Sequence, residues 1–293
     1  MFIDIHVHTR MFEGPRQQGD FASYFATPQE LKDKLEPLGV RAVVALPIVS
    51  PEHMWVHQST EEYLWAAEQY PGFIIPFMNI DPRMNTNTPE SNLSRQMEYY
   101  KGRGCKGLGE VTASLPFDDP FMENLFRHAE ANELPMIFHI APKQGGYYGI
   151  VDRLGLPLLE GALRKFPKLK FLGHSQPFWA EISGDLTEEA RNTYPSGKVA
   201  EGGAVVRLMR EYPNLCGDLS AGSGFNAISR DPEFGYAFLE EFRDRLFFGT
   251  DVCDPRNETP LPGYLNQAVD KGYISRECYE QVGWRNAEAL LGV

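Results

Sequence analysis

Two histidines near the start of the chain, His6 and His8, stand two residues apart in the apolar segment FIDIHVHT at 2–9. Because side chains alternate between the two faces of a β-strand, both imidazoles would point to one face while Val7 points to the other. Two imidazoles on one face are half of a ligand set for a divalent metal ion. A lone pair of this kind is a weak signal, so its meaning depends on what the rest of the chain places beside it.

Four more side chains that can bind a metal or transfer a proton occur late in strand-like segments: Glu110, His139, His174 and Asp251. Each has an ordinary alternative, because a core histidine is usually satisfied by a hydrogen bond and a carboxylate after a strand can cap the next helix. Six such residues at one level of a fold would be costly to bury without a cation. We therefore expect a divalent metal site.

The expected ligand set combines three imidazole nitrogens with one carboxylate oxygen, from His6, His8, His139 and Asp251. This mixture suits zinc, and also manganese, iron or cobalt.

These side chains can meet only if the strand ends form a ring, and the chain alternates strand-like and helix-like segments from end to end. Strands are expected at 2–8, 40–48, 73–80, 105–111, 135–140, 169–175, 214–220 and 245–251. Helices are expected at 28–39, 59–70, 88–101, 119–132, 155–166 and 199–212, with two more at 261–270 and 275–290. This α/β pattern predicts a (β/α)8 TIM barrel that forms a single domain over residues 1–293.

A doubly wound open sheet is the alternative fold. It would be expected to have a glycine-rich phosphate loop between an early strand and a helix. The GxGxxG match at 102–107, GRGCKG, instead follows a helix-like segment and leads into the strand expected at 105–111, and GxxxxGK[ST] does not occur in the sequence. Two connections, 9–26 after the first strand and 176–198 after the sixth, are too long for simple turns. Because both follow carboxyl ends of strands, they are expected to be lid or specificity loops.

Composition narrows the class of partner. The formal net charge is −12, which argues against non-specific binding to nucleic acid or to an anionic membrane. The longest apolar runs are strand-sized, and no secretory signal is expected before the first strand. The four cysteines are widely spaced and form no CxxC pair, which favours free thiols in a reducing cytoplasm.

Five segments together resemble the amidohydrolase superfamily, in particular its amidohydrolase-related (amidohydrolase 2) branch, which includes aminocarboxymuconate semialdehyde decarboxylase. They are IDIHVH at 3–8, PMIFHI at 135–140, PKLKFLGHS at 167–175, RLFFGTDV at 245–252 and WRNAEALLG at 284–292, in the family order. The resemblance implies a metal-dependent TIM-barrel enzyme, often a homodimer. It also implies that the four ligands expected above bind a divalent ion, foremost Zn²⁺.

The resemblance leaves the number of ions open. His174 matches the histidine on the sixth strand, which binds a second metal in binuclear members and is catalytic or contacts substrate in mononuclear ones. Many members of the branch lack a carboxylate on the fourth strand, but GLGEV looks like the TatD-type arrangement, in which a glutamate there binds metal. One tightly bound ion is expected, and a second ion bridged by Glu110 is the alternative.

The expected reaction is hydrolysis of an amide, ester or lactone in a small substrate, which could itself bear a carboxylate. The metal would activate a water, Asp251 would accept its proton and pass it to the leaving group, and His174 would orient the water or polarise the carbonyl. The alternative is a lyase, a decarboxylase or hydratase acting on an unsaturated or aromatic carboxylic acid.

A lyase would need a cation for the substrate carboxylate, and Arg10, Arg16 and Lys143 lie in suitable loops. Trp179, beside Phe178 after the sixth strand, is expected either to be a lid over the substrate or to pack against the barrel rim. Asp218 and Ser220 are expected to be hydrogen-bonding residues at the end of the seventh strand.

Two further functions are disfavoured. A TatD-like nuclease is suggested only by Glu110, and the acidic chain counts against it. A non-catalytic binding protein is disfavoured by the full ligand set. Among the other histidines, His53 and His57 are expected in a loop or pocket wall, and His128 on a helix surface.

Overall fold

The structure, a computed structural model, describes residues 1–12, 25–53 and 57–293. Helices begin where the sequence offers a cap. Thr27 accepts a hydrogen bond from the Glu30 amide, and the Glu30 carboxylate accepts one from the Thr27 amide, so α1 (Pro28–Leu35) starts in a reciprocal capping box. The side chains of Ser59 and Asp119 cap α2 (Thr60–Gln69) and α4 (Pro120–Ala131), each by accepting a hydrogen bond from one backbone amide of the first turn.

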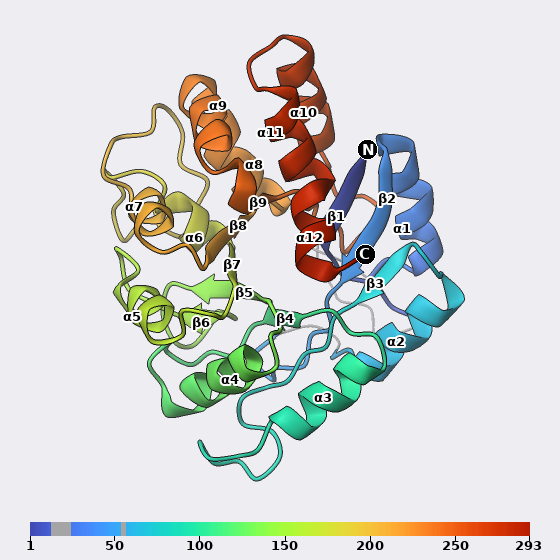
Figure 1. Cartoon of the computed structure of the whole chain (residues 1–293). Helices are drawn as coiled ribbons and strands as arrows, with labels where there is room; N and C mark the ends of the chain where they lie inside the picture. The colour runs from blue at the N-terminus through green and yellow to red at the C-terminus, as the bar shows by residue number, and fades with distance from the viewer. Residues whose placement is uncertain (13–24, 54–56) are drawn as a thin grey trace.

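Eight parallel strands form the barrel, in two hydrogen-bonded groups. The first group is β1 (Phe2–Val7), β2 (Val40–Ala45) and β3 (Ile74–Pro76). The second group is β4 (Leu108–Val111), β5 (Met136–Ala141), β7 (Phe171–His174), β8 (Leu215–Asp218) and β9 (Leu246–Phe247). Bridges between Met78 and Leu108 and between Val7 and Val252 join the two groups at both edges, so the sheet closes on itself. The predicted (β/α)8 barrel is confirmed (Figure 1).

The remaining helices lie around the strands, except α12, which lies over one end of the barrel (Figure 1). They are α3 (Ser94–Gly102), α5 (Pro157–Lys165), α6 (Gln176–Ala180), α7 (Ala204–Glu211), α8 (Ala221–Ser229), α9 (Pro232–Glu241), α10 (Leu261–Asp270), α11 (Arg276–Glu280) and α12 (Asn286–Leu291). Short helical turns cover Glu36–Leu38 (η1) and Arg243–Arg245 (η2), and a π-helical turn, η3 (Gln281–Arg285), joins α11 to α12. None of the helices in the described ranges is long and apolar enough to cross a membrane.

The structure differs from the sequence prediction at four places. A two-residue strand, β6 (Ile150–Val151), pairs with the end of β5 and was not predicted. Two helices, α8 and α9, were missed between β8 and β9. The segment expected as one helix at 275–290 is three consecutive helical segments. The connection expected after the sixth strand begins with a short helix, α6, while much of the expected first loop, 13–24, lies outside the described residues.

The buried apolar residues form two layers, one inside the barrel and one between the strands and the surrounding helices. The inner cluster includes Ile3, Ile5, Ile137, Leu172, Cys216 and Phe247, and Ala287 and Leu291 of α12 belong to it too. The outer cluster, which packs the strands against the helices, is much larger and includes alternate strand residues such as Met136, Phe138 and Phe171. The last helix therefore completes the core inside the barrel, and the opposite end, at the carboxyl ends of the strands, is left for polar residues.

Candidate metal centre

A polar layer lies directly beyond the inner apolar layer. On β5, β7 and β8 an inner apolar residue is followed two positions later by a polar one: Ile137 by His139, Leu172 by His174, and Cys216 by Asp218. Because residues two apart share a face of a strand, each polar side chain also points into the barrel, one level nearer its mouth. Each of these polar residues is less than one-tenth exposed.

The first strand needs a register shift to contribute to this layer. Ile3 and Ile5 belong to the inner cluster, but Val7 belongs to the outer one. The side chains that point into the barrel therefore change from odd-numbered to even-numbered positions, and His6 and His8 point inward. The pairing of β1 with β2 shifts between Asp4 and Val7, where such a change of face is expected. The prediction that both rings point to one side, with Val7 on the other, agrees with this arrangement.

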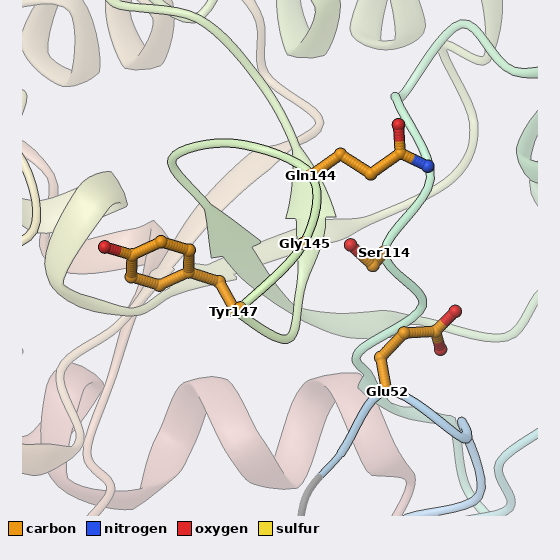
Figure 2. A pocket seen from close by; sticks show the side chains of 6 residues that line it. Glu52, Ser114, Gln144, Gly145 and Tyr147 are labelled. Carbon is orange, nitrogen blue, oxygen red and sulfur yellow. The ribbon is translucent and has the colours of Figure 1, made fainter.

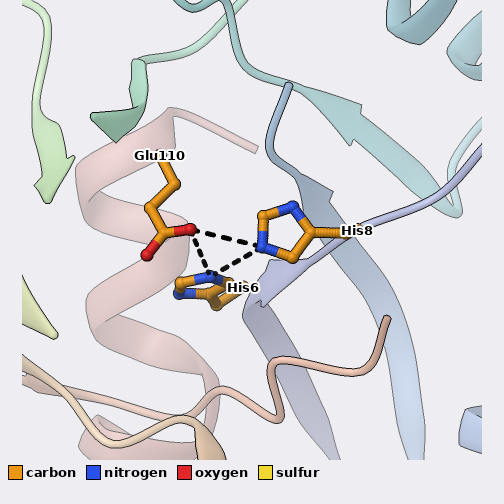
Figure 3. Close-up of side chains that lie close together, drawn as sticks. All are labelled: His6, His8 and Glu110. Carbon is orange, nitrogen blue, oxygen red and sulfur yellow. Dashed lines mark hydrogen bonds and ion pairs between the residues drawn. The ribbon is translucent and has the colours of Figure 1, made fainter. Parts of the chain in front are cut away.

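Four donor atoms meet at the centre of the polar layer: His6 Nε2, His8 Nε2, Glu110 Oε2 and Asp251 Oδ1. The two imidazole nitrogens are 3.3 Å apart, and Glu110 Oε2 lies 3.8 Å from that of His6 and 3.4 Å from that of His8 (Figure 3). Asp251 Oδ1 lies 3.4 Å from both nitrogens. Ligands held at about 2.0–2.2 Å from a tetrahedral ion are about 3.3–3.6 Å apart, so both carboxylate oxygens lie close to ligand spacing from the two imidazole nitrogens.

The other two histidines flank this group. His139 Nδ1 lies 2.9 Å from Glu110 Oε1, and His174 Nε2 lies 3.7 Å from Asp251 Oδ2. Ligand atoms of Glu110, His139 and His174 also fall within 4.8 Å of one another, as a second group of metal-binding spacing. All six residues named from the sequence are thus brought together, but Glu110 rather than His139 lies against the His6 and His8 pair.

A second ring of contacts fixes the orientation of the imidazoles. Asp218 Oδ2 lies 2.6 Å from His6 Nδ1, so Nε2 of His6 is the atom turned to the centre. The carbonyl oxygen of Leu46 lies 2.9 Å from His8 Nδ1, and the Ser220 hydroxyl lies 2.9 Å from His174 Nδ1. Contacts of this kind set the tautomer and raise the basicity of a ligating histidine.

The layer has a strong negative potential. Burial by itself raises the pKa of the Glu110 carboxyl, but hydrogen bonds from His139, His6 and His8 hold that pKa well below its usual range. Burial opposes protonation of His8, yet hydrogen bonds to Asp251 and Glu110 raise its pKa to about 9. The carboxylates therefore favour positive charge at this place, and a divalent cation would compete for it with protons.

Asp251 is the most open member of the group. Its side chain is 27% exposed, whereas those of the neighbouring His6, His8 and Glu110 are at most 5% exposed. Its backbone has a left-handed φ of 55°, and its amide donates a 2.7 Å hydrogen bond to the carbonyl oxygen of His6. The carboxylate is thus held at the side from which a substrate would approach.

An aromatic ring missed by the sequence analysis lines the same region. Tyr148 is stacked at a tilt between His139 and His53, with ring centroids 4.5 Å and 4.7 Å away. It lies in a glycine-rich loop whose sequence gives no periodic signal, so only the fold shows that it borders the centre. His53 is buried there as a wall residue, while His57 is exposed.

The residues expected to contact substrate are placed less centrally. Arg10 is half-buried and its Nε donates to the Phe25 carbonyl oxygen at 2.6 Å, whereas Lys143 is exposed with its ammonium 5.8 Å from the Tyr147 ring. Arg16 lies outside the described residues. Of the two expectations for Trp179, the structure favours packing, because its side chain is 1% exposed. Its indole N–H donates a hydrogen bond to the Asp218 carbonyl oxygen at 2.8 Å, so Trp179 holds the end of β8 in place.

His128, expected on a surface, is instead half-buried on α4, with Nδ1 at 2.7 Å from the Ser94 hydroxyl.

Comparison with known proteins places the whole chain in one group. A family model described as amidohydrolase matches residues 3–293. No curated protein matches the sequence.

Solved structures match over nearly their full length. An uncharacterised TIM-barrel protein from Bordetella bronchiseptica is 16% identical, with a TM-score of 0.66, over 99% of this chain and 98% of that one. A 5-carboxyvanillate decarboxylase from Sphingomonas paucimobilis is 15% identical, with a TM-score of 0.61, over 100% and 99% of the two chains. An amidohydrolase from Burkholderia multivorans with bound zinc is 14% identical, with a TM-score of 0.63, over 100% and 99%. At these identities the likeness shows the fold.

Proposed function

The chain belongs to the amidohydrolase family over residues 3–293, and from that premise we propose that it is a metal-dependent decarboxylase of a small carboxylic acid. The observation behind the proposal is the set of donor atoms around the His6 and His8 pair in the mouth of the barrel, where Glu110 Oε2 and Asp251 Oδ1 each lie 3.4–3.8 Å from the two imidazole nitrogens. Imidazole nitrogens and carboxylate oxygens at this spacing fit one divalent ion, and we propose zinc.

His6, His8, Glu110 and Asp251 would hold this ion. When bound, it would supply the positive charge that an anionic substrate needs in a chain of net charge −12. His139 and His174 would complete the wall, with His174 oriented by Ser220 toward the space beside Asp251.

Decarboxylation is favoured over hydrolysis by two considerations. One solved structure with this fold is a decarboxylase, matched over the full length of both chains. The second is Asp251, whose carboxylate is open to the mouth and can relay a proton from water to a substrate carbon.

In this reaction the bond between the carboxyl carbon and the adjacent carbon breaks, and carbon dioxide leaves. The electron pair stays on the substrate carbon, which takes a proton that the Asp251 carboxylate first accepts from water and then passes on. The hydroxide left from that water is neutralised by the buffer. Arg10, half-buried after β1, is the residue we propose for holding a second anionic group of the substrate; Lys143, being exposed, is the weaker candidate.

The test is a screen of aromatic and unsaturated carboxylic acids with zinc-loaded protein, measuring carbon dioxide release and acid release separately. Asp251→Asn should lower turnover by about 100-fold or more, because a positioned proton donor contributes about that factor. Asp118→Asn, at an exposed aspartate, is the matched control and should be fully active. Full turnover in Asp251→Asn with metal retained would contradict the proton role.

Hydrolysis of an amide, ester or lactone is the second candidate, and the position of Glu110 favours it. One of its oxygens faces His139 while the other faces His6 and His8, so the carboxylate lies between both groups of donors. Two ions could share such a carboxylate, and Asp251 would then accept a proton from the attacking water. Acid release without carbon dioxide, together with two ions per chain by elemental analysis, would establish this alternative.

A further inference from the structure

A cavity separate from the four-atom group opens on the loops that follow β2, β4 and β5. Its volume is about 340 Å³, and its described lining is Glu52, Ser114, Gln144, Gly145, Gly146 and Tyr147. Glu52, Ser114 and Gln144 lie along one side of it, and the Tyr147 side chain points away from them (Figure 2).

Ser114 gives the first sign that this cavity is built for a ligand. Its side chain is 4% exposed and lines the cavity, yet its hydroxyl has no hydrogen-bond partner among the described residues. Buried hydroxyls are normally paired, so an unpaired one in a residue that lines a cavity leaves a hydrogen bond that a group entering the cavity can supply.

Glu52 gives the second sign, because its carboxylate is held in place before any ligand binds. Both of its oxygens accept hydrogen bonds from the Arg83 guanidinium, one of them at 2.8 Å. Arg83 is itself fixed by Asp81, which accepts from Nε at 2.8 Å and from Nη2 at 2.6 Å. The pKa of Glu52 is lowered by its hydrogen bond with Arg83, so the cavity contains a carboxylate rather than a neutral acid.

The lining selects the chemistry of the ligand. Glu52 is the one charged group among the described lining residues, which disfavours an anion. Its charge is already paired with Arg83, which weakens its attraction for a cation. Ser114 and Gln144 each both donate and accept hydrogen bonds, and Glu52 retains lone pairs that can accept more. Hydroxyl groups match all three.

The cavity adjoins the proposed reaction centre. Ser114 follows Glu110 by four residues along the same segment. Glu52 precedes His53, whose ring contacts Tyr148, and Tyr148 contacts His139. Through these ring contacts, the residues that line the cavity are linked to the wall of the reaction centre.

We propose that this cavity binds a neutral, hydroxyl-rich group of the substrate, through Glu52, Ser114 and Gln144. The assignment as a substrate subsite rests on the proposed function, whereas the binding of hydroxyl groups does not.

The experiment is a ligand-observed NMR titration of the zinc-loaded protein with three non-reacting probes: myo-inositol, succinate and tetramethylammonium. We expect saturable binding of myo-inositol. Its affinity should fall about three- to tenfold in Ser114→Ala and at least about tenfold in Glu52→Gln, the usual effects of losing a neutral and a charge-assisted hydrogen bond. Ser196→Ala and Glu189→Gln, at exposed positions, are matched controls and should bind as the parent does.

Stability separates this role from a structural one. Because the Ser114 hydroxyl is unpaired in the free protein, Ser114→Ala should melt at the parent's temperature or above it, while binding myo-inositol less well. Non-saturable binding of myo-inositol, or equal affinity in Ser114→Ala, would overturn the proposal. So would tetramethylammonium binding that is lost in Glu52→Gln while myo-inositol does not bind. Carbon dioxide release is measured on the same samples, so failure of the reaction and failure of the subsite are seen independently.

Discussion

Removing the charge of Asp218 should weaken the metal centre although Asp218 is not one of its proposed ligands. Asp218 Oδ2 lies 2.6 Å from His6 Nδ1, and both side chains are fully buried. In that position the carboxylate orients the ring and increases the electron density that His6 offers through Nε2. Asparagine has the same shape, and its one oxygen can still accept the hydrogen bond from His6. Its NH2 group cannot accept the 3.0 Å hydrogen bond that the Ser220 amide donates to Asp218 Oδ1, so Asp218→Asn removes the charge together with that weaker contact.

The magnitude follows from the class of hydrogen bond. A bond to a charged acceptor contributes about 1.5–3 kcal/mol and a neutral one about 0.5–1.5 kcal/mol, so Asp218→Asn loses about 1–1.5 kcal/mol. This corresponds to about a tenfold rise in the Kd for zinc. Asp218→Ala loses the whole bond and should raise the Kd by up to about 100-fold, near the upper end for outer contacts of metal-binding histidines.

The assay is competition for zinc with a chelator of known affinity, followed by elemental analysis of the protein after gel filtration. Circular dichroism and melting curves of the zinc-loaded variants report whether the barrel is intact. Asp118→Asn is the control for loss of one negative charge from the surface. Equal zinc affinity in the parent and Asp218→Asn would refute the role of the charge, and equal affinity in Asp218→Ala would refute any role of Asp218.

Three further changes test other contacts. Glu110→Gln should lower the number of bound ions or raise the zinc Kd at least tenfold, because it removes a negative charge from both groups of donors; elemental analysis and chelator competition measure this. Gly249→Ala should disrupt the centre, since an added Cβ would lie 2.8 Å from Asp218 Oδ1 and from Ser220 Cβ, and zinc content and melting temperature should both fall. Arg83→Met should destabilise the protein at pH 7 but much less below about pH 4, where the two carboxylates that it pairs with are protonated on unfolding.

The sign of the pH effect follows from the two acids. The hydrogen bond with Arg83 is the main cause of the lowered pKa of Glu52; for Asp81, burial raises the pKa but hydrogen bonds with Arg83 lower it overall. A folded-state pKa below the unfolded one gives stability that is present above the unfolded pKa and is lost as the pH falls. A destabilisation by Arg83→Met that is constant from pH 7 to pH 3 would contradict this account.

Controls for the other two changes use matched positions. Glu189→Gln should keep the zinc stoichiometry of the parent, and Gly263→Ala, where an added Cβ meets open space, should keep both zinc and stability. Unchanged zinc binding in Glu110→Gln would remove Glu110 from the ligand set. Normal zinc content in Gly249→Ala would show that the side chains around Asp218 can move to accommodate the added Cβ.

The barrel was predictable because its physical pattern is local. Buried parallel strands are apolar on both faces, and caps such as Thr27 with Pro28 mark the helix starts. The candidate residues were also found because polar side chains at the ends of otherwise apolar strands break that pattern. His139 after Ile137 and His174 after Leu172 are examples.

The relative positions of the six residues were not predictable. Whether Glu110 or His139 lies against His6 depends on the register shift in β1 and on the stagger between strands that do not neighbour one another in sequence. Whether an aromatic residue after a strand points toward the active-site mouth or into the core also depends on packing between distant segments. Trp179 points into the core for this reason. Helix α8 was missed because AGSGFNAIS is rich in small residues of low helix propensity.

Closure of the barrel imposes an order on how the protein is made. β1 bonds to the far end of the chain, through the Ile5 amide to the Phe248 carbonyl oxygen and the bridge of Val7 to Val252. During synthesis, residues 2–7 leave the ribosome long before 246–252 exist, so one edge of the growing sheet stays unpaired until then. Asp251 is added in the same final stretch. Nascent chains can therefore hold His6 and His8 but not the completed centre, and we expect the ion to be taken up after the barrel has closed.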